Sequence, residues 1–405
     1  MSALDDCFLH DRDRLRHDEA LALLRSGLRA PERRVEQVAR DEALGRVLAQ
    51  DVAATFDVPG HTNAAVDGYA YAIGDAGREL PVSQRVTAGG APHPLETGTA
   101  ARIFTGAMLP EGADTVAMQE DCETAERTVR VPVLKRGANV RLRGEDLKAG
   151  TVALAAGRRV GEADVATLAA FGLDTVLVRA LLRVTLFSSG DELRTEGGLG
   201  SGEVFDANRP MLTAWMRHLP IALTDGGVLP DDRAAVEASL ADAARRSDIV
   251  LTTGGASRGE EDHMLAALDA LGTRQAWQIA VKPGRPLMFG RIGEAAYLGL
   301  PGNPVAACVC FLLYGRPTVL ALAGAEWQAP HGFAVPAGFA AKSKPDRREF
   351  LRGCLADGRL AKFARDGSGL ISSLRESDGL IEVPEDVTEI APGDPLTFLP
   401  WSSFR

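Results

Sequence analysis

Three short glycine-containing segments carry the residues best suited to hold a ligand. Residues 188–192 read Ser-Ser-Gly-Asp-Glu, residues 252–257 read Thr-Thr-Gly-Gly-Ala-Ser, and residues 301–304 read Pro-Gly-Asn-Pro. Glycine lets a backbone approach a ligand closely, and hydroxyl and free amide groups can hold oxyanions. Together the segments predict a site for a phosphate-bearing ligand. Each one alone is also what an ordinary connection from a strand to a helix favours, and that plainer interpretation stays open.

Two cations and a set of carboxylates extend this chemistry. Lys282 and Arg285 lie in Lys-Pro-Gly-Arg-Pro, a stiff turn that suits phosphate recognition. Carboxylates beside phosphates are the usual ligands of Mg²⁺, although an acid in a turn is more often a cap or a solvated group. Because no histidine cluster is visible, positioning, charge and metal are favoured over acid–base or covalent catalysis. The candidate acids are Asp67, Asp146, Asp191, Glu192, Asp231, Asp232 and Asp262.

The third segment can also be a helix start. Asn303 suits the N-cap position and Pro304 the first helical position, and small apolar residues follow. The backbone N–H groups and the dipole of this helix could instead face an anion. The sequence leaves both interpretations open.

The surrounding residues predict the elements that position these segments. Short β-branched or apolar runs at 184–187, 249–251 and 297–300 each directly precede one glycine segment. Helical patterns at 233–245 and 263–271 lie between the strands, which predicts βαβ units over 181–325 with a mainly parallel sheet. In such sheets ligands bind at the carboxyl ends of the strands. The three segments are therefore expected to meet at one edge.

The remaining chain has a different texture. Residues 18–50 and 162–171 have apolar spacings of three and four, which predict helices. Residues 51–160 and 326–405 alternate short apolar runs with turns and are predicted to be rich in strands.

Composition bounds the class of protein. The chain has 405 residues, 45% hydrophobic and 25% charged, which favours a folded protein of two to four domains over a disordered chain or a fibre. The net charge of −10 argues against a general electrostatic field for nucleic acid. Five scattered cysteines without a CxxC pair predict reduced thiols in the cytoplasm. The apolar run 305–314 is shorter than the roughly 20 residues of a membrane span.

An ordered series of motifs identifies a family that the chain resembles. It is similar to the molybdopterin molybdenumtransferases, the MoeA and gephyrin E-domain family, over essentially its whole length. The matching stretches are residues 65–70 (Ala-Val-Asp-Gly-Tyr-Ala), 105–114, 137–146, 190–193 (Gly-Asp-Glu-Leu), 206–208 (Asp-Ala-Asn), 254–262, 282–286, 300–304, 350–353 (Phe-Leu-Arg-Gly) and 367–369 (Gly-Ser-Gly).

The resemblance implies a reaction and an architecture. The family inserts molybdenum from molybdate into adenylylated molybdopterin, uses Mg²⁺, and releases AMP and molybdenum cofactor. It implies an elongated homodimer whose cleft is completed by the partner subunit, with transient contacts to the molybdopterin adenylyltransferase and to acceptor molybdoenzymes. The expected fold is a central three-layer α/β domain at 181–325, a helical and linker domain at 1–50 with 136–180, a β-rich domain at 51–135, and a C-terminal β-barrel-like domain at 326–405.

The resemblance also assigns roles to residues. Lys282, Pro301 and Pro304 would line the pterin and molybdate end, and Arg352 and Ser368 would approach molybdate from the last domain. Glu192 and Asp262 are the expected metal ligands. The expected catalytic residues are Asp67, Thr105, Asp146, Glu192, Asp231 and Asp262. The expected ligand-binding residues are Ser189, Gly190, Asp191, Gly254, Gly255, Ser257, Lys282, Arg285, Pro301, Gly302, Asn303, Pro304, Arg352 and Ser368.

Some positions depart from the family pattern and leave alternatives open. Residues 62–68 read Thr-Asn-Ala-Ala-Val-Asp-Gly where the family usually has Asp-Asn-Ser-Ala-Met-Asp-Gly. Gln278 and Arg285 stand where lysine is common. A non-catalytic dimeric pterin-binding scaffold of the same fold is therefore an alternative, and molybdopterin adenylyltransferase is a second one.

Overall fold

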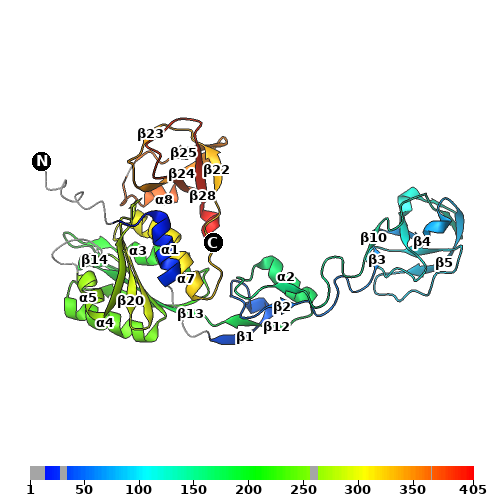
Figure 1. The fold of residues 1–405 in the computed structure, drawn as a ribbon, viewed down its shortest axis with the longest axis horizontal. Helices are drawn as coiled ribbons and strands as arrows, with labels where there is room; N and C mark the ends of the chain where they lie inside the picture. The colour runs from blue at the N-terminus through cyan, green and yellow to red at the C-terminus, as the bar shows by residue number, and fades with distance from the viewer. Residues whose placement is uncertain (1–13, 28–33, 256–262, 366) are drawn as a thin grey trace. The chain divides into compact units, whose positions relative to one another are not determined.

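The computed structural model describes residues 14–27, 34–255, 263–365 and 367–405 (Figure 1). Backbone contacts divide the chain into two compact units. The larger unit comprises the described residues before Gln50, with Gly157–Gly161 and Thr175–Arg405, and the smaller unit comprises Gln50–Ala156 and Glu162–Asp174. Buried apolar clusters form inside each unit. The four-domain division drawn from the sequence stays a prediction.

A six-stranded sheet lies at the centre of the larger unit. Its four strands β16, β13, β17 and β21 run parallel in that spatial order. β20 pairs antiparallel with β21, and β18 antiparallel with β20, so the sheet is mixed beyond the predicted parallel part. The strands are β13 (Leu182–Ser189), β16 (Ile221–Leu229), β17 (Ile249–Thr253), β18 (Gly272–Gln278), β20 (Pro286–Ile292) and β21 (Ala295–Leu300).

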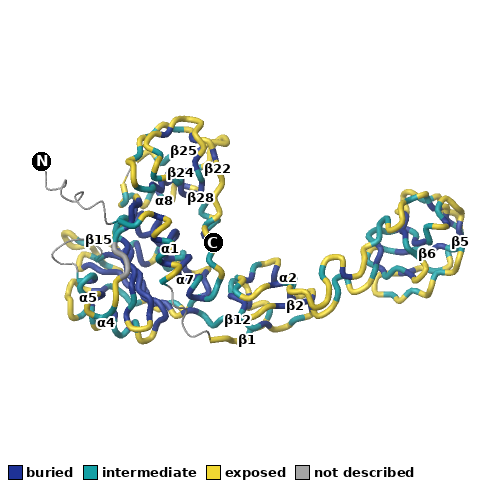
Figure 2. The backbone as a smooth tube through the Cα atoms, viewed as in Figure 1, coloured by how far each residue is buried: buried dark blue, intermediate teal, exposed yellow. Residues whose placement is uncertain are grey.

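Helices cover both faces of this sheet. Side chains alternate along each strand, so Leu251 and Leu298 pack on one face while Val250 and Tyr297 pack on the other. One face is covered by α1 (His17–Gly27), α3 (Asn208–Met216), α6 (Pro304–Cys310) and α7 (Arg316–Leu322), and the other by α4 (Arg233–Arg246) and α5 (His263–Leu271). This gives three layers, with buried residues concentrated in the sheet (Figure 2).

One core helix is longer than the sequence pattern indicated. α6, a π-helical turn at Phe311–Gly315 and α7 form a continuous helix Pro304–Leu322 of 19 residues, whereas the apolar run was read only to residue 314. By length and composition this helix could cross a membrane, but 94% of its most apolar 18-residue window is buried inside the protein. Its apolar surface is therefore used in the core of the α/β layers.

The expectation of helix over 18–50 is met by α1 up to residue 27 and is wrong from residue 34 on. Val35–Ala39 forms β1, which pairs antiparallel with β12 (Thr175–Arg179). Val47 and Leu48 make isolated bridges to Arg159 and Val178 and are fully buried. Pairing with residues far along the chain therefore overrides a local spacing that is compatible with a helix.

The last part of the chain forms a second sheet. Its path runs β19 (Val281–Lys282), β24 (Arg348–Ala356), β26 (Gly379–Val383), β28 (Pro395–Pro400) and β22 (Phe333–Pro336), and β25 (Arg359–Lys362) pairs with β24. A bridge between Ala337 and Leu360 brings β22 back toward β25, and the Gly338 N–H donates to the Leu360 carbonyl at 2.8 Å. The sheet thus curls around a small apolar core. Short elements complete it: β23 (Ala341–Lys342), β27 (Glu389–Ile390), α8 (Ser372–Arg375) and a 3₁₀ turn at Trp401–Phe404.

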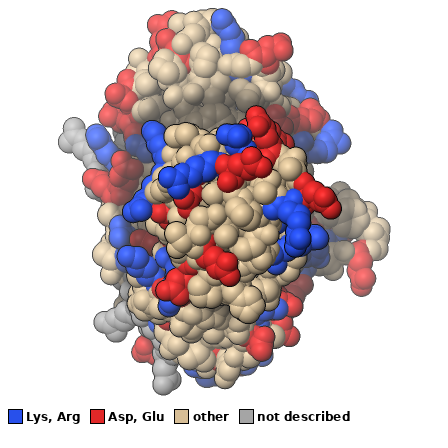
Figure 3. All heavy atoms as spheres, turned by 90° about the vertical axis from the view of Figure 1, so that its right-hand side faces the viewer, with Lys and Arg blue, Asp and Glu red and all other residues tan. Residues whose placement is uncertain are grey.

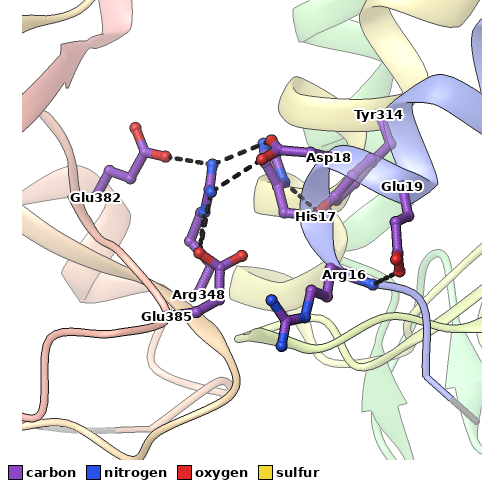
Figure 4. Close-up of polar contacts among 8 residues, drawn as sticks. All are labelled: Arg16, His17, Asp18, Glu19, Tyr314, Arg348, Glu382 and Glu385. Atoms are coloured by element: carbon purple, nitrogen blue, oxygen red, sulfur yellow. Dashed lines mark hydrogen bonds and ion pairs between the residues drawn. The ribbon is translucent and has the colours of Figure 1, made fainter.

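A charged cluster joins α1 to this C-terminal sheet (Figure 4). The Arg348 guanidinium lies 3.0 Å from carboxylate oxygens of Glu382 and Glu385 and 3.3 Å from Asp18 on α1. Beside it, His17 Nδ1 and the Tyr314 hydroxyl are 2.7 Å apart and buried. The ion-pair network therefore holds the first helix to the C-terminal sheet, and the buried polar pair holds it to the core helix Pro304–Leu322.

The smaller unit is rich in strands, as predicted. Its main sheet has the order β7-β4-β6-β5-β9-β8. The strands are β4 (Gly68–Tyr71), β5 (Glu79–Val86), β6 (Ala100–Ile103), β7 (Thr115–Met118), β8 (Glu123–Thr124) and β9 (Thr128–Arg130). Ladders of two residue pairs each join β3 (Asn63–Ala64) to β10 (Val140–Arg141) and β2 (Val52–Ala53) to β11 (Val152–Leu154). The predicted helix is α2 (Glu162–Ala170).

Candidate functional site

A cleft of about 1020 Å³ opens at the carboxyl ends of the parallel strands in the larger unit. The segments that follow β13, β17 and β21 line part of it, and residues of the C-terminal sheet and its loops line another part. Among the described residues, its lining includes Ser188, Ser189, Glu192, Leu193, Val204, Phe205, Asp206, Ala207, Asn208, Thr253, Gly254, Gly255, Lys282, Pro283, Gly284, Arg285, Pro286, Pro301, Gly302, Asn303, Pro304, Ala306, Leu351, Arg352, Gly367, Ser368 and Ile371.

The three glycine segments meet because their strands are neighbours in the sheet. β17 lies between β13 and β21, and all three run in the same direction. Gly254 has a φ of +93°, and a Cβ there would lie 2.5 Å from the carbonyl oxygen of Ser189. Only glycine fits so close an approach, which brings the second segment against the first.

Asn208, at the start of α3, braces two of these segments. Its side-chain Nδ2 donates to Thr253 Oγ1 at 2.9 Å and to the Gly302 carbonyl at 2.6 Å. The Thr253 hydroxyl in turn donates to the Pro301 carbonyl at 2.9 Å. Sequence analysis matched Asn208 to a family motif but gave it no role. Its position at a helix start, after an acid, was the available signal.

Asp206 is a buried carboxylate close to Asn208 in the chain, and it is hydrogen-bonded within the protein. Ser188 Oγ donates to Asp206 Oδ2 at 2.6 Å, and Arg209 donates to the same carboxylate through its backbone N–H and its Nε at 3.1 and 3.0 Å. Both oxygens of Asp206 are therefore occupied within the protein. The residue fixes the end of β13 rather than offering a free carboxylate to a ligand.

Lys282 is positioned by a buried carboxylate. Its Nζ lies 3.3 Å from Glu349 Oε2, while Arg347 donates to Glu349 Oε1 at 2.6 Å. Burial acts to raise the pKa of Glu349, but the Arg347 hydrogen bond and the Lys282 charge outweigh it and hold that pKa below its usual value. Glu349 stays ionised and keeps the ammonium group at the cleft wall.

Gly284 allows the Lys-Pro-Gly-Arg-Pro turn to pack on the core helix. Its φ is +115°, and a Cβ there would lie 2.3 Å from Cys310 Sγ. We expect Gly284→Ala to lower the free energy of unfolding by about 2 kcal/mol, because it adds a clash to an unfavourable φ. Gly202→Ala is the matched control, since Gly202 has a φ of +85° but nothing within 4 Å of a Cβ. Equal losses in urea unfolding would show that packing against Cys310 is unimportant.

The C-terminal part of the larger unit contributes Arg352 and Ser368 to the same cleft. Arg352 is 7% exposed, and its guanidinium donates to Ser373 Oγ at 3.2 Å and to the Gly367 carbonyl at 3.3 Å. The Ser368 carbonyl accepts the N–H of Val305, in the first turn of α6, at 3.0 Å. Asn303 and Pro304 hold the predicted cap and first-turn positions, without a side-chain cap bond from Asn303. The Val305 N–H is thus already used by the protein.

Three predicted residues in the larger unit lie beside the lining rather than in it. Asp191 and Asp231 exchange hydrogen bonds across the ends of β13 and β16: the Asp231 N–H donates to Asp191 Oδ1 at 3.1 Å, and the Asp191 N–H donates to Asp231 Oδ2 at 3.2 Å. The Gly190 carbonyl in this loop accepts a hydrogen bond at 3.1 Å from the N–H of Leu193, which lines the cleft. The two acids therefore fix neighbouring loops, and their contact with a ligand stays a prediction.

The smaller unit brings Asp67 and Thr105 together. The Thr105 N–H and hydroxyl donate to Asp67 Oδ1 at 2.8 and 2.6 Å. The Thr105 hydroxyl is the largest reason that the pKa of Asp67 lies below its usual value, followed by the Thr105 amide. Asp146 is exposed, and its backbone N–H donates to the Val58 carbonyl at 3.1 Å. Ser257 and Asp262 lie outside the described residues.

These features define a class of protein before any comparison. A parallel-strand edge with glycine loops, cations and the exposed acid Glu192 is suited to bind an anionic ligand. Sequence comparison narrows the class: residues 15–172 match the MoeA N-terminal region (domain I and II), 185–321 a probable molybdopterin binding domain, and 334–401 the MoeA C-terminal region (domain IV). The chain belongs to the molybdopterin molybdenumtransferase family.

Individual relatives resemble the chain over most of its length. The molybdopterin molybdenumtransferase of Haemophilus influenzae is 35% identical over 89% of this chain and 92% of its own length. The protein of the same name from Nostoc is also 35% identical, over 88% of this chain and 86% of its own length. The crystal structure of a molybdopterin biosynthesis moeA protein from Pyrococcus horikoshii, 30% identical, superposes with a TM-score of 0.83 over 96% of this chain and 100% of its own.

Proposed function

We propose that the protein inserts molybdenum into molybdopterin during molybdenum cofactor biosynthesis. The observation that carries this proposal is the cleft at the ends of β13, β17 and β21, where glycine loops meet Lys282, Arg285 and Arg352. Such a wall suits an anionic ligand, because amide groups and cations can bind phosphate and oxometal oxygens. The finer proposal is that the substrates are adenylylated molybdopterin and molybdate, and that AMP leaves.

Among the described residues of the lining, Glu192 is the acid that could bind a magnesium ion. Of the described acids in the lining, Asp206 is fully hydrogen-bonded, whereas Glu192 is exposed to the cleft. Mg²⁺ in proteins is commonly held by one or two carboxylates together with substrate phosphates. We propose that Glu192 is one such ligand; Asp262, the second predicted one, lies outside the described residues. When bound, Mg²⁺ would neutralise phosphate charge, while Lys282 and Arg352 orient the anion.

Asp67, Thr105 and Asp146 are proposed to serve the same reaction. The support is their match to the family motifs and the ionised state that Thr105 confers on Asp67. A homodimer and contacts with the adenylyltransferase and with acceptor enzymes are part of the proposal on the resemblance alone. The free cysteines are compatible with the proposed cytoplasmic location.

An AMP-release assay tests the proposed function. The purified chain is incubated with adenylylated molybdopterin and Mg²⁺, with and without molybdate, and AMP is measured by chromatography. Molybdate-dependent AMP release is the expected result. Tight binding of the substrate without AMP release would instead favour a non-catalytic scaffold. Formation of adenylylated molybdopterin from ATP and molybdopterin would favour the adenylyltransferase.

A further inference from the structure

Phe205 is an aromatic side chain left exposed at the rim of the cleft. It is 51% exposed, and its neighbour Val204 is 48% exposed, although both are apolar and both line the cleft. Asp206, the next residue, is 8% exposed. Exposed apolar side chains inside a ligand cleft are unusual enough to indicate binding surface, because a ligand would remove them from water.

The backbone that carries Phe205 is fixed on both sides. Val204–Phe205 forms β15, which pairs in parallel with β14 (Leu193–Arg194). The Val204 N–H donates to the Glu192 carbonyl at 2.9 Å, and the Asp206 N–H donates to the Arg194 carbonyl at 2.9 Å. The hydrogen bonds of the Asp206 carboxylate then anchor the strand to β13 and α3. The aromatic ring is thus presented from a stiff support, so little conformational freedom is lost when it contacts a ligand.

The chemistry of the cleft differs from one part of its wall to another. Lys282, Arg285 and Arg352 supply positive charge, and the glycine segments supply backbone that a ligand can approach closely. Phe205 and Val204 supply apolar surface with no charge. A ligand that satisfies both parts needs an anionic group and a flat apolar ring.

We infer that the ring of Phe205 stacks against a fused heteroaromatic ring of the ligand and so sets which way the ligand lies in the cleft. This inference deepens the proposed function and rests on it, because the proposed substrate carries two such rings, the pterin and the adenine. Stacking suits either ring, since each has a flat π-face. The anionic groups then lie toward the cations.

Calorimetric titration of four forms of the full chain tests the inference. The probes are AMP, neopterin and ribose 5-phosphate, which has the phosphate but no ring. Phe205→Ala should weaken at least one of the two ring-bearing probes about tenfold, whereas Phe205→Tyr should stay within about twofold of the natural chain. Phe333→Ala, at an exposed phenylalanine of β22 outside the cleft lining, is the matched control and should change nothing. Ribose 5-phosphate should bind all four forms equally.

The pattern across the probes identifies the ring. A loss confined to AMP assigns the adenine to Phe205, and a loss confined to neopterin assigns the pterin. Unchanged affinities for both in Phe205→Ala overturn the inference, as does failure of the natural chain to bind either ring. An equal loss for ribose 5-phosphate overturns it too, because it would show a general disturbance of the cleft.

A fluorescence measurement adds a readout that a purely structural role would not produce. Phe205→Trp places an indole at the rim, and its emission should fall when a ring stacks on it, while Phe333→Trp should show no such change. The proposed function is judged separately by molybdate-dependent AMP release from the natural chain. A protein that releases AMP but shows no Phe205 effect keeps the proposed function and loses this inference.

Discussion

Replacing Asp67 with asparagine should lower the rate constant of AMP release by at least about 100-fold while leaving the fold intact. Asparagine keeps the shape and can still accept from the Thr105 N–H and hydroxyl through its side-chain oxygen. It removes the negative charge that those hydrogen bonds stabilise, since they hold the pKa of Asp67 below its usual value. A charge positioned for a reacting centre is commonly worth this much in rate.

The comparison variants separate charge from structure. Thr105→Ser retains the hydroxyl and should retain most of the activity. Thr105→Val removes it and should give an intermediate rate, because the backbone N–H of residue 105 still donates a hydrogen bond to Asp67 Oδ1. Asp121→Asn is the control for a lost surface charge in the same unit, since Asp121 is exposed in a 3₁₀ turn. If Asp67→Asn released AMP as fast as Asp121→Asn, the proposed role of Asp67 would be wrong.

Acid should destabilise the larger unit through His17 before most carboxylates titrate. Burial is the main cause that lowers the pKa of His17 from 6.5 to about 4, and the charge of Arg348 adds to it, while Asp18 and Glu385 act in the opposite direction. Between pH 6.5 and 4, His17 is therefore protonated in the unfolded chain but neutral in the folded protein. The stabilisation is complete above pH 6.5 and is lost as the pH falls to about 4, a change of roughly 3 kcal/mol.

Urea unfolding at a series of pH values measures this loss. His17→Gln is the matched variant, because glutamine can hydrogen-bond the Tyr314 hydroxyl but does not titrate. The natural chain should lose more stability than the variant between pH 6.5 and 4, and the two curves should run parallel below pH 4. The ion pairs of Arg348 with Glu382 and Glu385 are present in both proteins and cancel in the difference. Parallel curves over the whole range would refute the prediction.

The sequence predicted the part of the site that follows from local pattern. Strand, glycine and helix recur in order after residue 181, and neighbouring parallel strands must bring their carboxyl ends to one edge. Ser189, Gly254 and Pro301 therefore meet as expected. Arg352 and Ser368 were expected only from the resemblance, and the structure places both in the cleft lining.

Residues whose roles depend on distant partners were missed. Asn208 matters because Thr253 and Gly302 come within hydrogen-bonding distance, and nothing in the local sequence gives that distance. The same limit explains β1, whose partner strand lies at Thr175–Arg179. Phe205 was also missed, since a short exposed strand has no periodic pattern to mark it.

The net charge likewise does not show where charged side chains lie on the surface. On the face drawn in Figure 3, acidic and basic side chains are interspersed among neutral ones. The net charge of −10 thus gives no guide to where an anion binds. The cations that matter, such as Lys282, are set by individual carboxylate partners in the cleft wall.

The cleft draws its wall from segments that sequence comparison assigns to separate modules, 185–321 and 334–401. Ser368 even accepts a backbone hydrogen bond from the first turn of α6. A chimera that exchanged the last module between relatives would therefore inherit a hybrid binding surface. Selection on ligand recognition must act on both modules at once, so they are expected to diverge in step rather than to be shuffled independently.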